Sequence, residues 1–135
     1  MILEGVSDIG LADSDTTPQA KIQKRLVAAY KEIATRIRAP GIPVLRATIT
    51  PSGSSPDSGY IHLYSNEEHE RTRQRINTFI RESGVFDAVL DFDQVLRDLP
   101  APSQLLGKYD SGDHLHPNAA GYQALADYFP REIFS

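Results

Sequence analysis

The segment Ile42–Thr50, with the sequence IPVLRATIT, decides the fold class of this chain. It is short, mostly apolar and rich in β-branched residues, which favours a β-strand. Its apolar residues do not alternate strictly with polar ones, a pattern typical of strands that are covered on both faces, as in parallel sheets. We therefore expect a buried strand here, with other elements packed on both of its faces.

Helical and strand-like segments alternate along the chain around this strand. Upstream, residues 18–38 place apolar side chains at spacings of three and four, which predicts a helix that begins at Pro18 and ends before Gly41. The first ten residues, MILEGVSDIG, predict the end of a buried strand that runs into a polar turn. This strand has about four residues, whereas strands average five to six, so we expect the chain to begin inside an element of structure.

Downstream, Ser65 and Glu68 form a capping box that opens a helix ending near Gly84. The other predicted elements are a strand, a short helical turn and a final helix, over residues 85–92, 95–99 and 118–129. This alternation predicts an α/β fold with a parallel sheet, in which polar residues after the strands line the ligand crevice. The residues that we expect to converge there are Ser7, Asp8, Thr48 to Thr50, Asp91, Asp93, Asp113 and His116.

The composition is that of one globular domain and argues against several function classes. The chain has 135 residues, of which 40% are hydrophobic and 24% are charged. Its formal net charge of -4, without a cluster of basic residues away from acidic ones, argues against nucleic acid as a partner. No apolar run approaches the roughly 18 residues of a membrane span. The absence of cysteine excludes disulfides and thiolate chemistry, and no signal-peptide pattern is present, so the localisation stays open.

The segment Asp110–Tyr122, with the sequence DSGDHLHPNAAGY, carries the strongest functional signal. Asp113 and His116 lie three residues apart, and Pro117 keeps His116 out of helical geometry. A carboxylate can fix the tautomer of an imidazole, which can then take a proton from a serine hydroxyl and return it to a leaving group. The alternative interpretation is that Asp113 and Asn118 only cap the following helix and that His116 is an exposed loop residue.

This segment resembles the Asp-x-x-His-Pro signature of the SGNH (GDSL-type) serine esterases. Gly5–Asp8, at the other end of the chain, is similar to the Gly-x-Asn-Asp block of that family. The resemblance implies a three-layer α/β/α fold with a flavodoxin-like parallel sheet. It also implies that residues 1–135 form a single, partial domain with about three strands.

The resemblance also implies roles for individual residues. Asp113 would orient His116, and His116 would act as the general base toward a serine. Gly5 and Ser7 would contribute to oxyanion and substrate binding. Ser7 stands where the family has asparagine, and loss of one oxyanion donor can cost about 10²- to 10³-fold in turnover. Because a serine hydroxyl is shorter and rotates freely, Ser7 is interpreted equally well as a simple turn residue.

The nucleophile of the family is not found in this sequence. The family carries its serine in a Gly-Asp-Ser block after the first strand, and a second block supplies a glycine N–H to the oxyanion. Both blocks would lie upstream of Met1, so we expect a C-terminal portion that is inactive alone. Ser14 follows Asp13, but Ala12 replaces the glycine of the block, and we interpret Ser14 as a loop residue.

The implied substrate is a small ester, and an acylated carbohydrate is the candidate class. Glu4–Gly10 and Tyr109–His116 are most similar to sugar-ester deacetylases of the family. No cofactor and no metal are expected, because Asp113, His114 and His116 are too close in sequence for a tetrahedral site.

Two other hypotheses stay open. The chain could be a non-catalytic binding or complementation module that associates with itself or another chain through an open sheet edge at Ile2–Glu4. It could also be a metal-dependent hydrolase, whose ligands would be Asp8, Asp91, Asp93 and Asp113.

Overall fold

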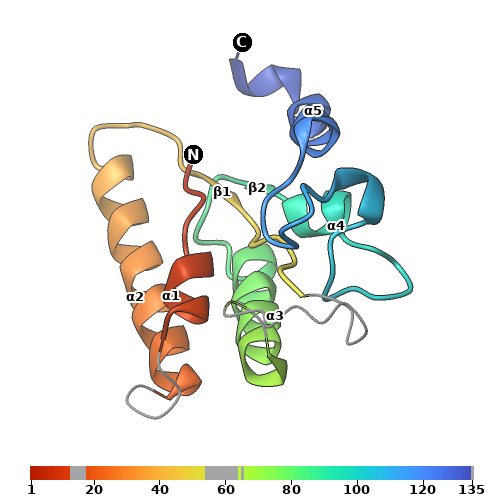
Figure 1. Cartoon of the computed structure of the whole chain (residues 1–135). Helices are drawn as coiled ribbons and strands as arrows, with labels where there is room; N and C mark the ends of the chain where they lie inside the picture. Colours follow the sequence, from red (N-terminus) through yellow and green to blue (C-terminus); the bar gives the residue numbers. More distant parts are fainter. Residues whose placement is uncertain (13–17, 54–63, 65, 135) are drawn as a thin grey trace.

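Two short parallel strands lie between two groups of helices (Figure 1). The computed structural model describes residues 1–12, 18–53, 64 and 66–134. In chain order the elements are α1 (Val6–Gly10), α2 (Gln19–Arg38), β1 (Leu45–Ala47), α3 (Glu67–Glu82), β2 (Ala88–Leu90), α4 (Phe92–Leu96), η2 (Gly107–Tyr109), α5 (Ala119–Tyr128) and η3 (Arg131–Phe134). None of the described helices is both long and apolar enough to cross a membrane.

The strand β1 is central, because chain segments pair with both of its edges. On one edge it pairs in parallel with β2, in the register Leu45 to Ala88. On the other edge Ile2 forms a parallel bridge to Arg46. The Ile2 N–H donates to the Leu45 carbonyl at 2.8 Å, and the Ala47 N–H donates to the Ile2 carbonyl at 3.1 Å. The predicted α/β fold is confirmed, and the first predicted strand is present as this single bridge.

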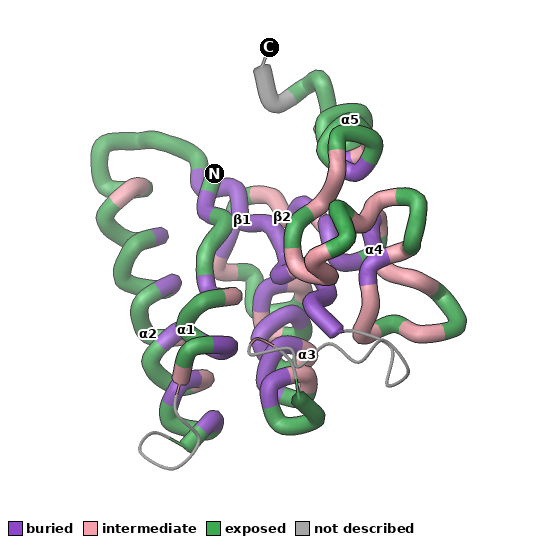
Figure 2. Tube along the Cα trace, in the orientation of Figure 1, coloured by how far each residue is buried: buried purple, intermediate pink, exposed green. Residues whose placement is uncertain are grey.

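The two faces of β1 bury side chains in two separate cores. Val44 packs with Ile22, Leu26 and Tyr30 of α2 and with residues of α1 and α3. Leu45 and Ala47 point to the opposite face and pack in a second core. The other buried members of the second core are Leu90, Phe92, Leu96, Leu105 and Leu125. Figure 2 shows the same arrangement in α2, where buried residues lie on the side toward the sheet and exposed ones on the outer side. This is the layering predicted for a strand covered on both faces.

The helices α2 and α3 follow their predicted ranges closely. α2 ends before Gly41, whose φ of +86° is a conformation that glycine adopts easily. Asn66 caps α3 by accepting the His69 N–H at 2.9 Å. The predicted cap Ser65 lies outside the described residues.

Two predictions for the short connections are wrong. Residues 6–10 form the helix α1 instead of a polar turn, and the side chain of Gln19 donates to the Ile9 carbonyl at 3.1 Å. The helical turn predicted over 95–99 begins earlier, at Phe92, because Asp91 caps α4 by accepting the Gln94 N–H. Helices of about five residues are shorter than the window in which helical periodicity can be recognised.

Candidate active site

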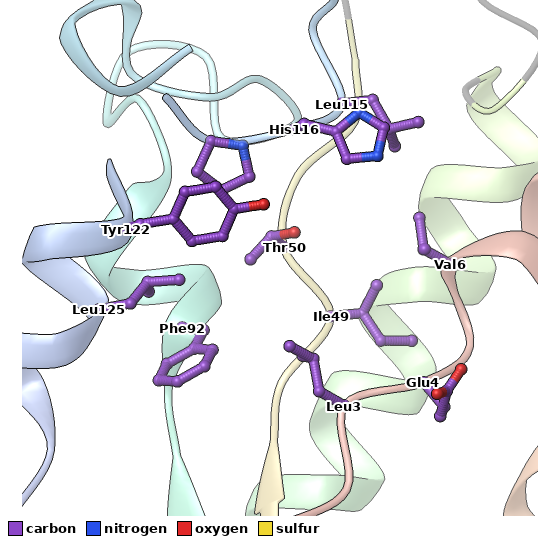
Figure 3. Close-up of a pocket in the computed structure, with 11 residues that line it drawn as sticks. Leu3, Glu4, Val6, Ile49, Thr50, Phe92, Leu115, His116, Tyr122 and Leu125 are labelled. Atoms are coloured by element: carbon purple, nitrogen blue, oxygen red, sulfur yellow. The ribbon is translucent and has the colours of Figure 1, made fainter. Parts of the chain in front are cut away.

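A pocket of about 220 Å³ lies where the chain leaves the strands (Figure 3). Apolar side chains form most of its wall, among them Leu3, Val6, Ile49, Phe92 and Leu125. The polar side chains of the described residues that line it are Glu4, Thr50, His116 and Tyr122. Leu3, Ile49 and Phe92 follow Ile2, β1 and β2 in the chain, so the pocket occupies the crevice position that the parallel fold predicts.

Asp113 and His116 are in direct contact at this pocket. The Asp113 Oδ2 atom lies 2.6 Å from His116 Nδ1. The other oxygen, Oδ1, accepts the Ser111 hydroxyl at 2.8 Å and the N–H groups of Leu115 and His116 at 2.9 and 2.8 Å. Burial alone would raise the pKa of the Asp113 carboxyl, but these four hydrogen bonds together hold its pKa well below the usual range. Asp113 is therefore a carboxylate at neutral pH, placed to hold the imidazole through Nδ1.

A second aspartate–histidine pair shapes the loop that carries this contact. Asp110 Oδ2 lies 2.6 Å from His114 Nδ1, and Asp110 Oδ1 accepts the N–H groups of Gly112 and His114 at 2.8 and 3.0 Å. His114 has a φ of +60°, which is unusual for a residue other than glycine. This pair was not among the residues predicted from the sequence, although the spacing of Asp110 and His114 contained the signal for it.

Asn118 closes the loop at its base. Its side-chain oxygen accepts the Gly121 N–H at 3.0 Å and so caps α5. Its side-chain nitrogen donates to the carbonyls of Lys108 and Asp110, both at 3.0 Å. The capping interpretation therefore holds for Asn118, whereas the side-chain oxygens of Asp113 accept hydrogen bonds within the loop.

A comparison with known protein families gives a match over most of the chain. A family model described as the GDSL-like Lipase/Acylhydrolase family matches residues 1–124. The chain belongs to this family. The match confirms the resemblance to SGNH (GDSL-type) proteins, and it supports a general esterase or hydrolase function. No curated protein matches the chain.

Gly5 and Ser7, the two residues that the family resemblance assigns to oxyanion and substrate binding, lie next to the pocket. Gly5 is buried with a φ of +120°, and a Cβ atom there would collide with the Tyr30 hydroxyl. Ser7 is exposed on α1. The pocket is lined by their neighbours Glu4 and Val6. The close contact with Tyr30 explains the glycine at position 5, and the oxyanion role of Gly5 and Ser7 stays a prediction.

Asp91 and Asp93 form ion pairs away from the pocket, which corrects the expectation that they line the crevice. The side chain of Asp93 is fully buried. Its Oδ2 atom lies 2.8 Å from Arg81 and 3.4 Å from Arg97, and its Oδ1 atom pairs with Arg73. Asp91 pairs with Arg81 at 2.7 Å. Burial raises the pKa of the Asp91 carboxyl, but Arg81 and the hydrogen bonds from Thr48 and the Gln94 N–H together outweigh this effect, and the pKa is lowered.

This ion-pair cluster joins α3 to the segment after β2, and it was not predicted from the sequence. The cluster also weakens the hypothesis of a metal-dependent hydrolase, because it uses two of the four carboxylates that the hypothesis requires. Within the described part of the chain, no three histidine, aspartate or glutamate side chains are grouped so that they could hold a metal ion.

Proposed function

We propose that this chain supplies the Asp113–His116 pair of a Ser-His-Asp triad to a carboxylic ester hydrolase. The observation that carries the proposal is the 2.6 Å contact between Asp113 Oδ2 and His116 Nδ1, with the imidazole in the wall of the pocket (Figure 3). When Nδ1 holds its proton toward Asp113, the neutral imidazole presents Nε2 as a proton acceptor. In the proposed reaction, a serine attacks the ester carbonyl, His116 takes the serine proton and gives it to the leaving alcohol, and water then releases the acyl group.

The nucleophile of the proposed reaction does not come from the described wall of the pocket. Among the described residues that line it there is no serine, and the hydroxyl groups belong to Thr50 and Tyr122. We therefore propose that the isolated chain has little esterase activity. The pocket size suits a small ester, and the likeness of Tyr109–His116 to sugar-ester deacetylases makes an acylated carbohydrate the candidate substrate.

The first experiment tests the Asp113–His116 pair directly by chemical modification. Diethyl pyrocarbonate acylates unprotonated imidazole nitrogens, and peptide mapping by mass spectrometry locates the product. We expect His116 to be modified rapidly and to react more slowly in Asp113→Asn, because the asparagine no longer holds the proton on Nδ1. His69, which is buried, is the internal control that should stay slow in both proteins. Equal modification rates of His116 in the two proteins would contradict the proposal.

A second experiment tests the proposed low activity of the chain alone. Hydrolysis of p-nitrophenyl acetate by the purified chain should be close to the background rate, and a fluorophosphonate probe should label no serine. Turnover that is lost in His116→Ala, together with a labelled serine in this chain, would show that the nucleophile is present after all.

A non-catalytic complementation module is the second candidate function. It is favoured by one observation: within the part of the chain that the structure describes, the N–H and C=O of Leu3 at the edge of the sheet have no hydrogen-bond partner.

A further inference from the structure

Ser111 is hydrogen-bonded to both residues of the proposed catalytic pair. Its N–H donates to the His116 carbonyl at 3.1 Å, and its hydroxyl donates to Asp113 Oδ1 at 2.8 Å. The N–H bond lies beside the short antiparallel bridge between Asp110 and Pro117 that closes the loop. The backbone of Ser111 is therefore fixed against the residue that carries the imidazole, and its side chain reaches the carboxylate that holds this imidazole.

The Asp113 carboxylate must be held against rotation for its contact with His116 to persist. The torsion of an aspartate about the bond to its carboxyl group has only broad preferences, so an unheld carboxylate turns away from its partner at little cost. Oδ1 accepts the Ser111 hydroxyl and the N–H groups of Leu115 and His116, while Oδ2 lies 2.6 Å from His116 Nδ1. Three donors on one oxygen thus direct the other oxygen to the imidazole.

The Ser111 hydroxyl differs from the other two donors in its place in the chain. Leu115 and His116 follow Asp113, so their N–H groups belong to the segment on its C-terminal side. Ser111 precedes Asp113, and its hydroxyl ties the same oxygen to the segment on the N-terminal side. The Asp113 side chain is 42% exposed, so water competes for its hydrogen bonds. A donor from the other side of the loop therefore restricts a carboxylate that two local N–H groups would hold less firmly.

The same contact distinguishes Ser111 from the nucleophile of the proposed reaction. A nucleophilic serine gives its proton to Nε2 of the imidazole, whereas Nδ1 faces the carboxylate. The Ser111 hydroxyl donates to that carboxylate, on the Nδ1 side of the His116 ring. Ser111 is also not one of the residues that line the pocket. Its hydroxyl is thus placed to orient the acid and not to attack an ester.

We propose that Ser111 is a positioning residue of the proposed hydrolase, which holds the Asp113 carboxylate so that Oδ2 faces His116 Nδ1. This role rests on the proposed function, because it assigns Ser111 to the same pair. Through its hydrogen bond Ser111 favours the tautomer of His116 that carries the proton on Nδ1 and presents Nε2 to the nucleophile. The bond also stabilises the ionised form of Asp113 and is one of those that lower the pKa of this carboxyl.

The experiment locates the His116 proton by nitrogen-15 shifts at neutral pH and follows the modification of His116 by diethyl pyrocarbonate. Ser111→Ala removes the hydroxyl but keeps the N–H that bonds to His116. We expect the Nδ1-protonated fraction to fall between those of the natural chain and Asp113→Asn, and modification to slow by about two- to fivefold. Ser111→Thr keeps a hydroxyl and should restore both values. Ser83→Ala is the matched control and should change neither, because it removes an exposed hydroxyl that accepts the Val85 N–H in another part of the chain.

Two further measurements separate positioning from support of the fold. In the Asp113→Asn background, Ser111→Ala should have no additional effect on the modification of His116, because the hydroxyl acts through the carboxylate. In acid, the change in the Leu115 and His116 amide shifts that reports Asp113 should move to higher pH in Ser111→Ala, since one hydrogen bond to the ionised form is lost. Ser111→Thr should leave it in place. A loss of fold stability would instead accelerate amide exchange in α2 as well.

The outcomes distinguish the role of Ser111 from the proposed function. A shift of the His116 proton in both Ser111→Ala and Asp113→Asn, with recovery in Ser111→Thr, supports both proposals. A shift in Asp113→Asn alone overturns the role of Ser111 and leaves the proposed function standing. No shift in either variant contradicts both. An effect of Ser111→Ala that persists in the Asp113→Asn background also overturns the role of Ser111, because the hydroxyl would then act by another route.

Discussion

Asp93 and Asp113 are both acidic residues near one end of the sheet, but their partners and their burial differ. Asp93 follows β2, and Asp113 precedes α5. Asp93 is fully buried, and its partners are arginines that come from two different parts of the chain. The Asp113 side chain is 42% exposed, and the partners of its oxygens that we describe come from its own loop.

The difference in partners supports the proposal that Asp113, and not Asp93, takes part in the chemistry. The charge of Asp93, whose side chain is fully buried, is compensated by three guanidinium groups, so it holds α3 against the segment after β2. Asp113 instead holds a histidine that lines a pocket. A sequence that shows only the two acids cannot distinguish these roles, whereas their partners and their burial can.

Breaking the Asp93 cluster should have the largest effect on stability. Asp93→Asn keeps the size of the side chain but removes its charge, and Arg73, which is almost fully buried, then loses one of its two carboxylate partners. Removal of one partner from a buried ion pair costs about 3 kcal/mol in the free energy of unfolding. Urea denaturation followed by circular dichroism measures this loss.

Asp98→Asn is the matched control for the Asp93 variant. Asp98 lies only a few residues away and is partly buried, but its side chain makes no ion pair or hydrogen bond among the described residues. Its replacement should change the free energy of unfolding by less than about 0.5 kcal/mol. Similar losses in the two variants would mean that the buried cluster does not stabilise the fold.

The contrast between Asp93 and Asp113 also explains what the sequence could predict. The buried strand within Ile42–Thr50 and the final helix were predicted because their signals are local. The Asp113–His116 contact is also local, since a spacing of three residues brings the two side chains together. The pairing of Arg73 with Asp93 joins residues 20 positions apart, and no local pattern encodes it. Arg46 was missed for a related reason, because its partners lie in the first four residues of the chain.

Breaking the Asp110–His114 pair should have an intermediate and local effect. Asp110→Asn removes the charged acceptor of the two loop N–H groups and of the His114 imidazole. Hydrogen bonds to charged groups contribute about 1.5–3 kcal/mol, and this carboxylate also supports the positive φ of His114. We expect hydrogen exchange of the Gly112 and His114 amides to accelerate by about tenfold or more, while exchange in α2 is unchanged. Unchanged exchange at Gly112 and His114 would show that the loop does not depend on Asp110.

Asp113→Asn should have the smallest effect on the stability of the whole fold, about 1 kcal/mol or less, because the Asp113 side chain is 42% exposed and water weakens the net contribution of its hydrogen bonds. Its effect should be confined to the loop and should depend on pH. The folded pKa of Asp113 lies below the unfolded value, so the carboxylate stabilises the loop above a pH of about 3.9 and this contribution is lost as the pH falls further. The amide chemical shifts of Leu115 and His116 should therefore change only in strong acid in the natural chain. In Asp113→Asn this change should be absent, because the titrating carboxyl is gone.

At neutral pH, nitrogen-15 shifts should show the His116 proton on Nδ1 in the natural chain and distributed over both nitrogens in the variant. A change in the position of the His116 proton with only a small change in stability would separate Asp113 from Asp93, since a carboxylate that only stabilises the fold would change stability and leave the tautomer of His116 unaffected.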